Sequence, residues 1–196
     1  WGPDAGEWAM QALALDQDPI EVSCPDGAEL RMDTFRLLVD RQSGETDYVA
    51  NKERLLNGLR AVFERRMVSD PLNRLMLRPG LTWEDVDCLR AYLGYSLQIG
   101  PFFAADVAHR VLCARPVLTG TLADFFHARF NPRFGEADSE SRSQRSESAR
   151  RAVLEGLGRI QDAAEDRVFR TFLNLIEATG RTNAFRSDRK GHYLSL

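Results

Sequence analysis

The chain has 196 residues, of which 43% are hydrophobic and 28% are charged, values typical of a folded globular protein rather than a disordered chain. Its 26 basic and 29 acidic residues give a net charge of −3 and are interspersed, so no broad positive surface is available to hold a nucleic acid backbone. No apolar run approaches the roughly 20 residues that cross a bilayer. We therefore expect no nucleic acid partner and no membrane contact.

The three cysteines indicate the redox environment of the protein. Cys24, Cys88 and Cys113 lie far apart and none belongs to a C-x-x-C pair. An odd number of widely separated cysteines favours free thiols in a reducing compartment, so the sequence predicts a cytoplasmic protein. Because the chain begins with Trp1 rather than methionine, we interpret it as part of a longer polypeptide.

Residues 1–45 are predicted to form the end of a small α/β unit. Four apolar residues at helical spacing predict a short helix over residues 6–15: Trp8, Ala9, Ala12 and Leu13. Residues 20–24 and 33–40 are rich in β-formers and flank Pro25-Asp26-Gly27, where the glycine can adopt the positive φ of a tight reversal. We therefore expect a helix followed by a hairpin.

Residues 46–132 are predicted to be a helical domain. An apolar face predicts a helix over residues 46–67. Thr82 and Asp85 have the spacing of a capping box that begins a second helix, and apolar residues on opposing sides of that helix place it inside a bundle. Two further helices are expected over about 103–114 and 117–130, and their short connections predict antiparallel neighbours.

Residues 133–151 are polar, rich in Ser, Arg and Glu, and are interpreted as a linker or the solvated start of a helix. Their arginines are balanced by acidic residues, which argues against a nucleic acid tail. Residues 152–196 are predicted to hold a long amphipathic helix, clearest over 165–179, in which Asp166 and Arg170 lie four apart as a supporting ion pair. The fold class is therefore mainly α, a helical bundle with a small N-terminal α/β portion.

Several patterns that can carry chemistry are incomplete here. His109 and Cys113 are four apart on one predicted helix face, but two ligands do not make a metal site. Gly156-x-Gly158 lacks the third glycine and the preceding strand of a dinucleotide fingerprint, so we interpret it as helix packing. The neighbouring carboxylates at 84–85 and 165–166 fit helix starts, and no nucleophile elbow is present. No catalytic, cofactor-binding or metal-binding residue is assigned.

Six polar residues lie within or beside strongly apolar helix faces, where a buried polar group needs a partner. We predict that they form a structural hydrogen-bond network or, alternatively, an interdomain contact. They are Arg90, Tyr92, Tyr95, Gln98, Arg181 and Asn183.

The order and spacing of several short segments between residues 55 and 195 resemble the large bacterial NAD-specific glutamate dehydrogenases. The segments are 81–86 (LTWEDV), 89–92 (LRAY) with Tyr95, 98–100 (QIG), Phe125 with 128–132 (ARFNP), 165–167 (EDR), 172–179 (FLNLIEAT), 181–183 (RTN) and 193–195 (YLS). The part before residue 55 is similar to the end of an ACT-like regulatory domain.

The resemblance implies a parent enzyme that oxidises L-glutamate to 2-oxoglutarate and ammonia with NAD. It places this chain in the helical region ahead of the catalytic domain, with no cofactor in the chain itself. The implied partners are the downstream catalytic domain and the upstream regulatory domains of the same polypeptide, with a homo-oligomeric assembly. The implied role is a non-catalytic scaffolding, interdomain or regulatory one. The alternative is a stand-alone helical protein-interaction or regulatory module.

Overall fold

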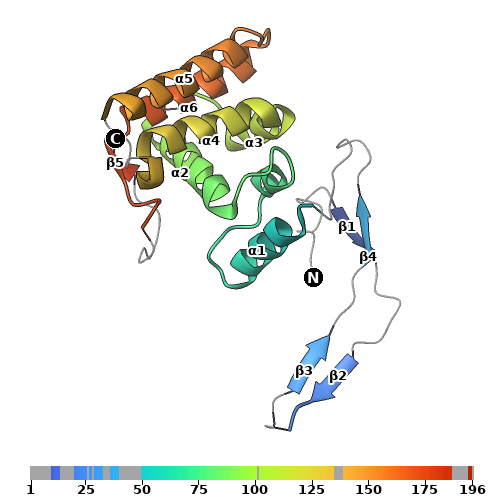
Figure 1. Ribbon diagram of the computed structural model, residues 1–196. Coiled ribbons are helices and arrows are strands. Elements are labelled where there is room, and N and C mark those ends of the chain that lie inside the picture. The colour runs from blue at the N-terminus through green and yellow to red at the C-terminus, as the bar shows by residue number, and fades with distance from the viewer. Residues whose placement is uncertain are drawn as a thin grey trace. The chain divides into compact units, whose positions relative to one another are not determined.

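The computed structural model describes residues 10–13, 20–25, 27, 29–32, 36–39, 50–100, 102–134, 139–186 and 194–195. Its backbone contacts divide the chain into two units, residues 1–46 and 47–196. The fold is mainly helical, as the sequence predicts (Figure 1). Among the described residues, no helix has the length and apolar content needed to cross a membrane.

The described part of the first unit consists of short antiparallel strand pairs. Strand β1 (Met10–Leu13) pairs with β4 (Arg36–Val39), and β2 (Ile20–Ser23) pairs with β3 (Glu29–Met32). Gly27 has φ +83° and its N–H donates to the carbonyl of Cys24 at 2.9 Å. The reversal at Pro25–Gly27 is therefore confirmed.

Two expectations for this unit are wrong in detail. Residues 10–13 are a strand, so the helix expected over 6–15 is not formed there; a few apolar residues in a short window fit either period, and pairing with β4 decides between them. The hairpin partner of β2 is residues 29–32 rather than 33–40, because a tight turn pairs the residues that directly follow it. Residues 36–39 of the second predicted strand do form a strand, β4, which pairs with β1. Residues 6–9, 14–15, 33–35 and 40 of the two predictions lie outside the described part of the chain.

The second unit begins with α1 (Lys52–Phe63), which is shorter than the helix expected over 46–67. It ends where Arg65 takes φ +56°, a left-handed conformation that cannot continue a helix. A 3₁₀ helix, η3 (Pro71–Met76), follows; Asp70 caps its start by accepting from the N–H of Leu72 at 2.9 Å.

Four helices of the bundle were anticipated at close to their observed bounds: α2 (Trp83–Ile99), α3 (Ala105–Ala114), α4 (Pro116–Phe130) and α6 (Ala163–Ala178). The capping box of α2 is present, since Asp85 N–H donates to the Thr82 hydroxyl at 3.2 Å and the Thr82 N–H donates to the Asp85 carboxylate at 3.0 Å. Asp162 caps α6 through the N–H groups of Ala164 and Glu165. Local chemistry therefore fixes where these helices begin.

The polar segment contains a full helix, α5 (Ser139–Leu157), preceded by the short 3₁₀ turn η4 (Pro132–Phe134). α5 lies along α4 (Figure 1). At Gly156 a Cβ would stand 2.4 Å from Cδ1 of Leu118 in α4, so the glycine allows a close approach of the two helices, as the packing interpretation predicted. A short ribbon of β5 (Arg181–Thr182) with β6 (Leu194–Ser195) follows α6.

The core of the second unit is built from α2, η3, α3, α4, α5 and α6. Its largest side chains with essentially no exposure are Tyr92, Phe125, Phe169, Phe172, Leu72, Leu75, Met76, Leu112, Leu122, Ile176, Val86 and Val153. Buried residues of α4 lie around most of its circumference, which is the pattern of a helix surrounded by others. α4 contacts α3, α5 and α6, and its side chains Phe126 and His127 contact Tyr92 and Asp85 of α2. It is the central helix of the bundle.

Candidate functional site

Arg90 forms the densest polar cluster of the helical unit. Its guanidinium binds both carboxylate oxygens of Asp70, with Nε to Oδ2 at 2.5 Å and Nη2 to Oδ1 at 3.0 Å. It also donates to Asp87 at 2.9 Å and to the Asn73 side-chain oxygen at 3.1 Å. Since Asp70 caps η3, this one arginine fastens the start of η3 to the middle of α2.

Electrostatics around Arg90 favour the charged pair. Burial by itself acts to lower the pKa of Arg90, but the hydrogen bonds and charges of Asp70 and Asp87 outweigh it and raise that pKa. A bidentate arginine–carboxylate pair is the strong form of such a contact. The cluster is thus a stable ion pair that holds two segments together.

Tyr92 links α2 to α6. Its hydroxyl lies 2.8 Å from the hydroxyl of Thr179, and both residues are buried. The Thr179 hydroxyl already donates its single hydrogen to the carbonyl of Leu175 at 2.7 Å, so the Tyr92 hydroxyl is the donor in this pair. Burial raises the pKa of Tyr92, which keeps the phenol protonated as this role requires.

His127, near the end of α4, is held at both ring nitrogens. Nε2 lies 2.6 Å from Oδ1 of Asp85 at the start of α2. Nδ1 lies 3.2 Å from the side-chain nitrogen of Asn131, whose oxygen accepts from the N–H of Arg133 at 3.0 Å. Because that backbone donor fixes the orientation of the Asn131 amide, Nδ1 accepts and Nε2 carries the proton. Both nitrogens are therefore occupied in structural contacts.

The titration of this pair follows from its contacts. The hydrogen bond to Asp85 raises the pKa of His127 above its ordinary value, against an opposing effect of burial. For Asp85, burial acts to raise the pKa, but hydrogen bonds from His127 and Thr82 prevail and lower it. Phe185, which follows β5, packs its ring against His127 and Phe126. The ion pair joins the start of α2 to the end of α4, and the ring contacts join the segment after β5 to α4.

Three arginines tie the ends of α4, α5 and α6 together. Arg129 donates to the carbonyl of Thr179 at 3.3 Å, and Arg142 donates to the carbonyl of Arg129 at 2.8 Å. Each contact satisfies a carbonyl at the end of a helix. Arg150 of α5 pairs with Glu177 of α6 at 2.5 Å. These cations complete helix ends and bridge neighbouring helices.

The six polar residues singled out in the sequence fall in different places. Arg90 and Tyr92 lie in the two separate clusters just described. Tyr95 and Asn183 are half-buried, while Gln98 and Arg181 are exposed. The described hydrogen bonds do not bring the six together. As one network, the six residues stay a prediction.

Sequence reasoning missed Asp70, Asp85 as an ion-pair partner, and His127. A signal was present for two of them, since Asp70-Pro71 has the form of a cap followed by a first-turn proline, and His127 and Asn131 stand four apart. The partners are 20 and 42 residues away along the chain, so the signals could not name them.

Cys113, weighed above as a metal ligand with His109, has another contact. The Cys113 thiol donates to the carbonyl of Pro71 at 3.2 Å, and burial raises the pKa of this thiol to about 11. Across the described ranges, no three His, Cys, Asp or Glu side chains gather closely enough to hold a metal ion. Of the adjacent carboxylates, Asp85 caps α2, and Asp166 pairs with Arg170 at 2.7 Å as predicted.

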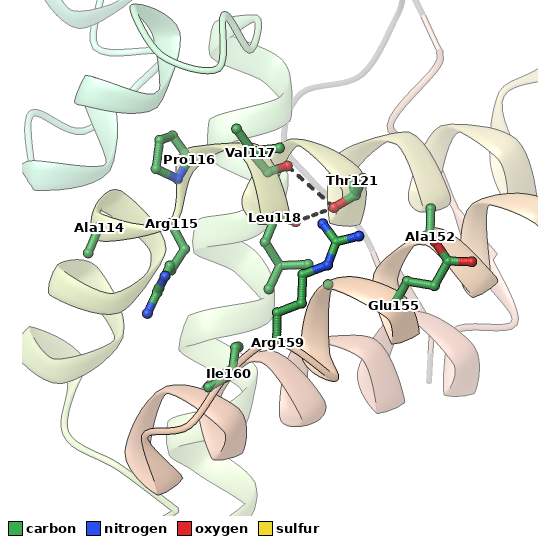
Figure 2. A pocket seen from close by; sticks show the side chains of 11 residues that line it. Ala114, Arg115, Pro116, Val117, Leu118, Thr121, Ala152, Glu155, Arg159 and Ile160 are labelled. Carbon is green, nitrogen blue, oxygen red and sulfur yellow. Dashed lines mark hydrogen bonds between the residues drawn. The ribbon is translucent and has the colours of Figure 1, made fainter. Parts of the chain in front are cut away.

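The surface of the helical unit is hollowed where α3 passes into α4 beside the end of α5 (Figure 2). This hollow has a volume of about 410 Å³. Figure 2 shows the Arg159 side chain crossing it between Leu118 and Glu155 toward Thr121. A second hollow, of about 730 Å³, lies further along α4 and α5 and shares Thr121 and Ala152 with the first.

The fold and its polar clusters define a helical unit whose polar groups serve its own architecture, and sequence comparison shows which proteins contain a similar region. Residues 67–132 match the sequence profile of the family described as "Glutamate dehydrogenase, helical motif 3". The matched residues begin after α1, end just beyond α4 and contain Asp70, Arg90, Tyr92 and His127.

Curated relatives extend the similarity. The chain is 30% identical over 182 residues to the NAD-specific glutamate dehydrogenase of Mycobacterium tuberculosis, covering 90% of this chain. It is 36% identical over 125 residues to that of Pseudomonas aeruginosa and 33% identical over 127 residues to that of Halomonas elongata, covering 63% and 64% of this chain. The chain is thus similar to a region of the NAD-specific glutamate dehydrogenases, which confirms the resemblance seen in the sequence.

The relatives are far longer than the region they share with this chain. The shared region covers 11% of the relative from Mycobacterium tuberculosis, 7% of that from Halomonas elongata and 8% of that from Pseudomonas aeruginosa. The chain therefore spans about a tenth of these relatives' length.

Proposed function

We propose that this chain is a non-catalytic helical segment of a large NAD-specific glutamate dehydrogenase, and that its role is to hold other parts of the polypeptide in place. In this proposal, glutamate is oxidised with NAD by polypeptide outside residues 1–196. The helical unit supplies a rigid support, and the strands of residues 1–45 belong to an ACT-like regulatory unit ahead of it.

The observation that carries the proposal is the use made of the polar side chains. Arg90 joins η3 to α2, Tyr92 joins α2 to α6, and His127 joins α4 to α2. A catalytic acid or base needs a nitrogen or oxygen open to a substrate, whereas both ring nitrogens of His127 are engaged within the bundle. Polar groups of this kind favour a scaffold over a reaction centre.

The same contacts give the scaffold its rigidity. Each cluster joins segments that are distant in sequence, up to 87 residues apart for Tyr92 and Thr179. Such cross-links make the unit fold and unfold as one body. A domain resting on it would then be positioned by the whole bundle rather than by one helix.

The test is made in the full-length polypeptide that contains this chain. Arg90→Met weakens the bundle without touching any substrate, so we expect a lower temperature of thermal inactivation. At temperatures where the variant stays folded, kcat and the KM values for glutamate and NAD should stay within about twofold of the unmodified protein, because only folding stability has changed. Arg151→Met, on the exposed surface of α5, is the matched control and should change neither quantity.

His127→Gln tests the non-catalytic part directly. If His127 is structural, the pH profile of kcat at low temperature keeps its shape. A loss of kcat of about tenfold or more, equivalent to about 1.4 kcal/mol of transition-state stabilisation, in a variant whose bundle is shown by hydrogen exchange to be folded, would overturn the proposal.

A further inference from the structure

The two hollows described above form one groove along the seam between α4 and α5. Four residues of α4 line it at the spacing of a single helix face: Val117, Thr121, Asp124 and Ala128. The facing wall from α5 is Arg145, Ser148, Ala149, Ala152, Glu155 and Gly156. Thr121 and Ala152 line both hollows, so the groove is continuous past the middle of both helices.

The other side of the α4–α5 pair is already covered. Val153 and Leu157 of α5 are buried at 0% and 2% exposure, and Arg150 on the same face of α5 pairs with Glu177 of α6. α6 therefore packs against one side of the seam. On the opposite side, no described element fills the groove.

The groove has the form and lining that a helix requires. Two helices packed side by side leave a groove into which the side chains of a third helix fit. Small or apolar residues make up much of the lining, and Val117 at one end is 78% exposed, a high value for a side chain of this kind. An amphipathic helix laid in such a groove buries an apolar face against it.

The charged side chains at the first hollow indicate which chemical group a docked helix would carry there. Arg159 crosses this hollow (Figure 2), and no carboxylate within the described ranges pairs with its guanidinium. Arg115, on the other wall, is already paired with Glu165 at 2.9 Å. A carboxylate on the docked helix would therefore meet Arg159.

We infer that the α4–α5 groove receives an amphipathic helix from another part of the same polypeptide, with an apolar face toward Ala152 and an acidic side chain toward Arg159. This inference rests on the proposed function. The chain spans only 7 to 11% of its long relatives, so a great length of polypeptide is available to supply the occupant. A second copy of this chain is the competing occupant.

The experiment uses the full-length polypeptide with a cysteine placed by Ala152→Cys or by Gln144→Cys. Both positions lie on α5 and are exposed in this chain, but Gln144 lines neither hollow. Labelling by N-ethylmaleimide is followed by mass spectrometry of the two peptides, and circular dichroism verifies that each variant is folded.

Under native conditions we expect the thiol at 152 to react about tenfold more slowly than the thiol at 144, because the docked helix must first open. In denaturant the two rates should agree. Equal rates under native conditions would overturn the inference. The thermal-inactivation result for Arg90→Met does not depend on the groove, so the proposed function can stand while this inference fails.

A benzophenone maleimide attached at position 152 then identifies the occupant. A cross-link within one chain, to a segment outside residues 1–196, supports the inference. A product with the mass of two chains, or no cross-link, overturns it. Adding Arg159→Glu should raise the labelling rate at 152 several-fold, whereas Arg159→Lys should leave it nearly unchanged, since a lysine keeps the positive charge.

Discussion

The hydroxyl of Tyr92 donates to the hydroxyl of Thr179 across 2.8 Å, in the buried interior between α2 and the end of α6. The direction is set by Thr179, which gives its own hydrogen to Leu175. The two partners are therefore not equivalent, although either residue can in general donate or accept.

This asymmetry makes a first prediction. Thr179→Val leaves a buried phenol donor without an acceptor and should cost about 1–3 kcal/mol of unfolding free energy. Tyr92→Phe removes the donor but leaves Thr179 bonded to Leu175, so we expect a smaller cost of about 0.5–1.5 kcal/mol. Urea denaturation of both variants measures the difference, and a greater loss for Tyr92→Phe would contradict the assigned direction.

Arg90→Met should destabilise the bundle at least as much as either change. The methionine removes the bidentate partner of Asp70 and leaves that carboxylate and Asp87 half-buried without their cation. We expect a loss of about 1.5–3 kcal/mol, the range for hydrogen bonds to charged groups. Arg90→Lys should recover only part of it, because one ammonium cannot replace the forked guanidinium. Equal stability of the lysine variant and the unmodified chain would argue against the bidentate geometry.

The His127–Asp85 pair predicts a pH dependence. The pKa of His127 is raised in the folded state, so its contribution to stability is fully present below the unfolded pKa of about 6.5 and is lost as pH rises through the folded pKa. The stability difference between the unmodified chain and His127→Gln should therefore grow as pH falls from about 8 to about 6. Denaturation across this range measures it; a difference that shrinks would contradict the prediction.

Two neighbours should move the pKa of His127 in opposite directions. Asp85→Asn removes the carboxylate that favours the protonated ring, so NMR titration should give a lower pKa. Asn131→Ala removes a donor that favours the neutral ring, so the pKa should rise. If Asn131→Ala lowers the pKa, the assigned orientation of the Asn131 amide is wrong.

Phe172 tests the core. It is fully buried in α6, and Phe172→Asp loses about 1.5–3 kcal/mol of burial while placing an unpaired charge in the interior. Since domains are stable by only about 5–15 kcal/mol, we expect the helical unit to unfold. Asn174→Asp, on the exposed side of the same helix, is the control and should leave the circular dichroism spectrum unchanged.

The sequence predicts those elements whose start and face are both marked locally. The capping box at Thr82 and Asp85 and the apolar face over residues 165–179 locate α2 and α6 well. The strand at residues 10–13 could not be distinguished from a helix, because its identity depends on pairing with residues 36–39. α5 was ambiguous for a similar reason, since contact with α4 decides whether a polar segment is ordered.

The candidate site, too, can be predicted from the sequence only in part. The sequence predicts that Arg90 and Tyr92 need hydrogen-bond partners, because they are polar residues among apolar ones. Their partners Asp70 and Thr179 are brought to them only by the packing of η3 and α6 against α2. A single sequence shows which groups need partners, and the fold alone shows which groups meet that need.

The close approach at Gly156 bears on how this region tolerates change in length. Gly156 lets α5 lie close to Leu118 of α4, and the rotational setting of α5 is held by the burial of Val153 and Leu157 on its inner face. Inserting a single residue before Gly156 would turn the following part of the helix by about 100°. Val153 or Leu157 would then leave the interior and a neighbouring polar residue would enter it. The serine- and arginine-rich stretch therefore cannot be lengthened freely as a linker could, even though its composition looks like that of one.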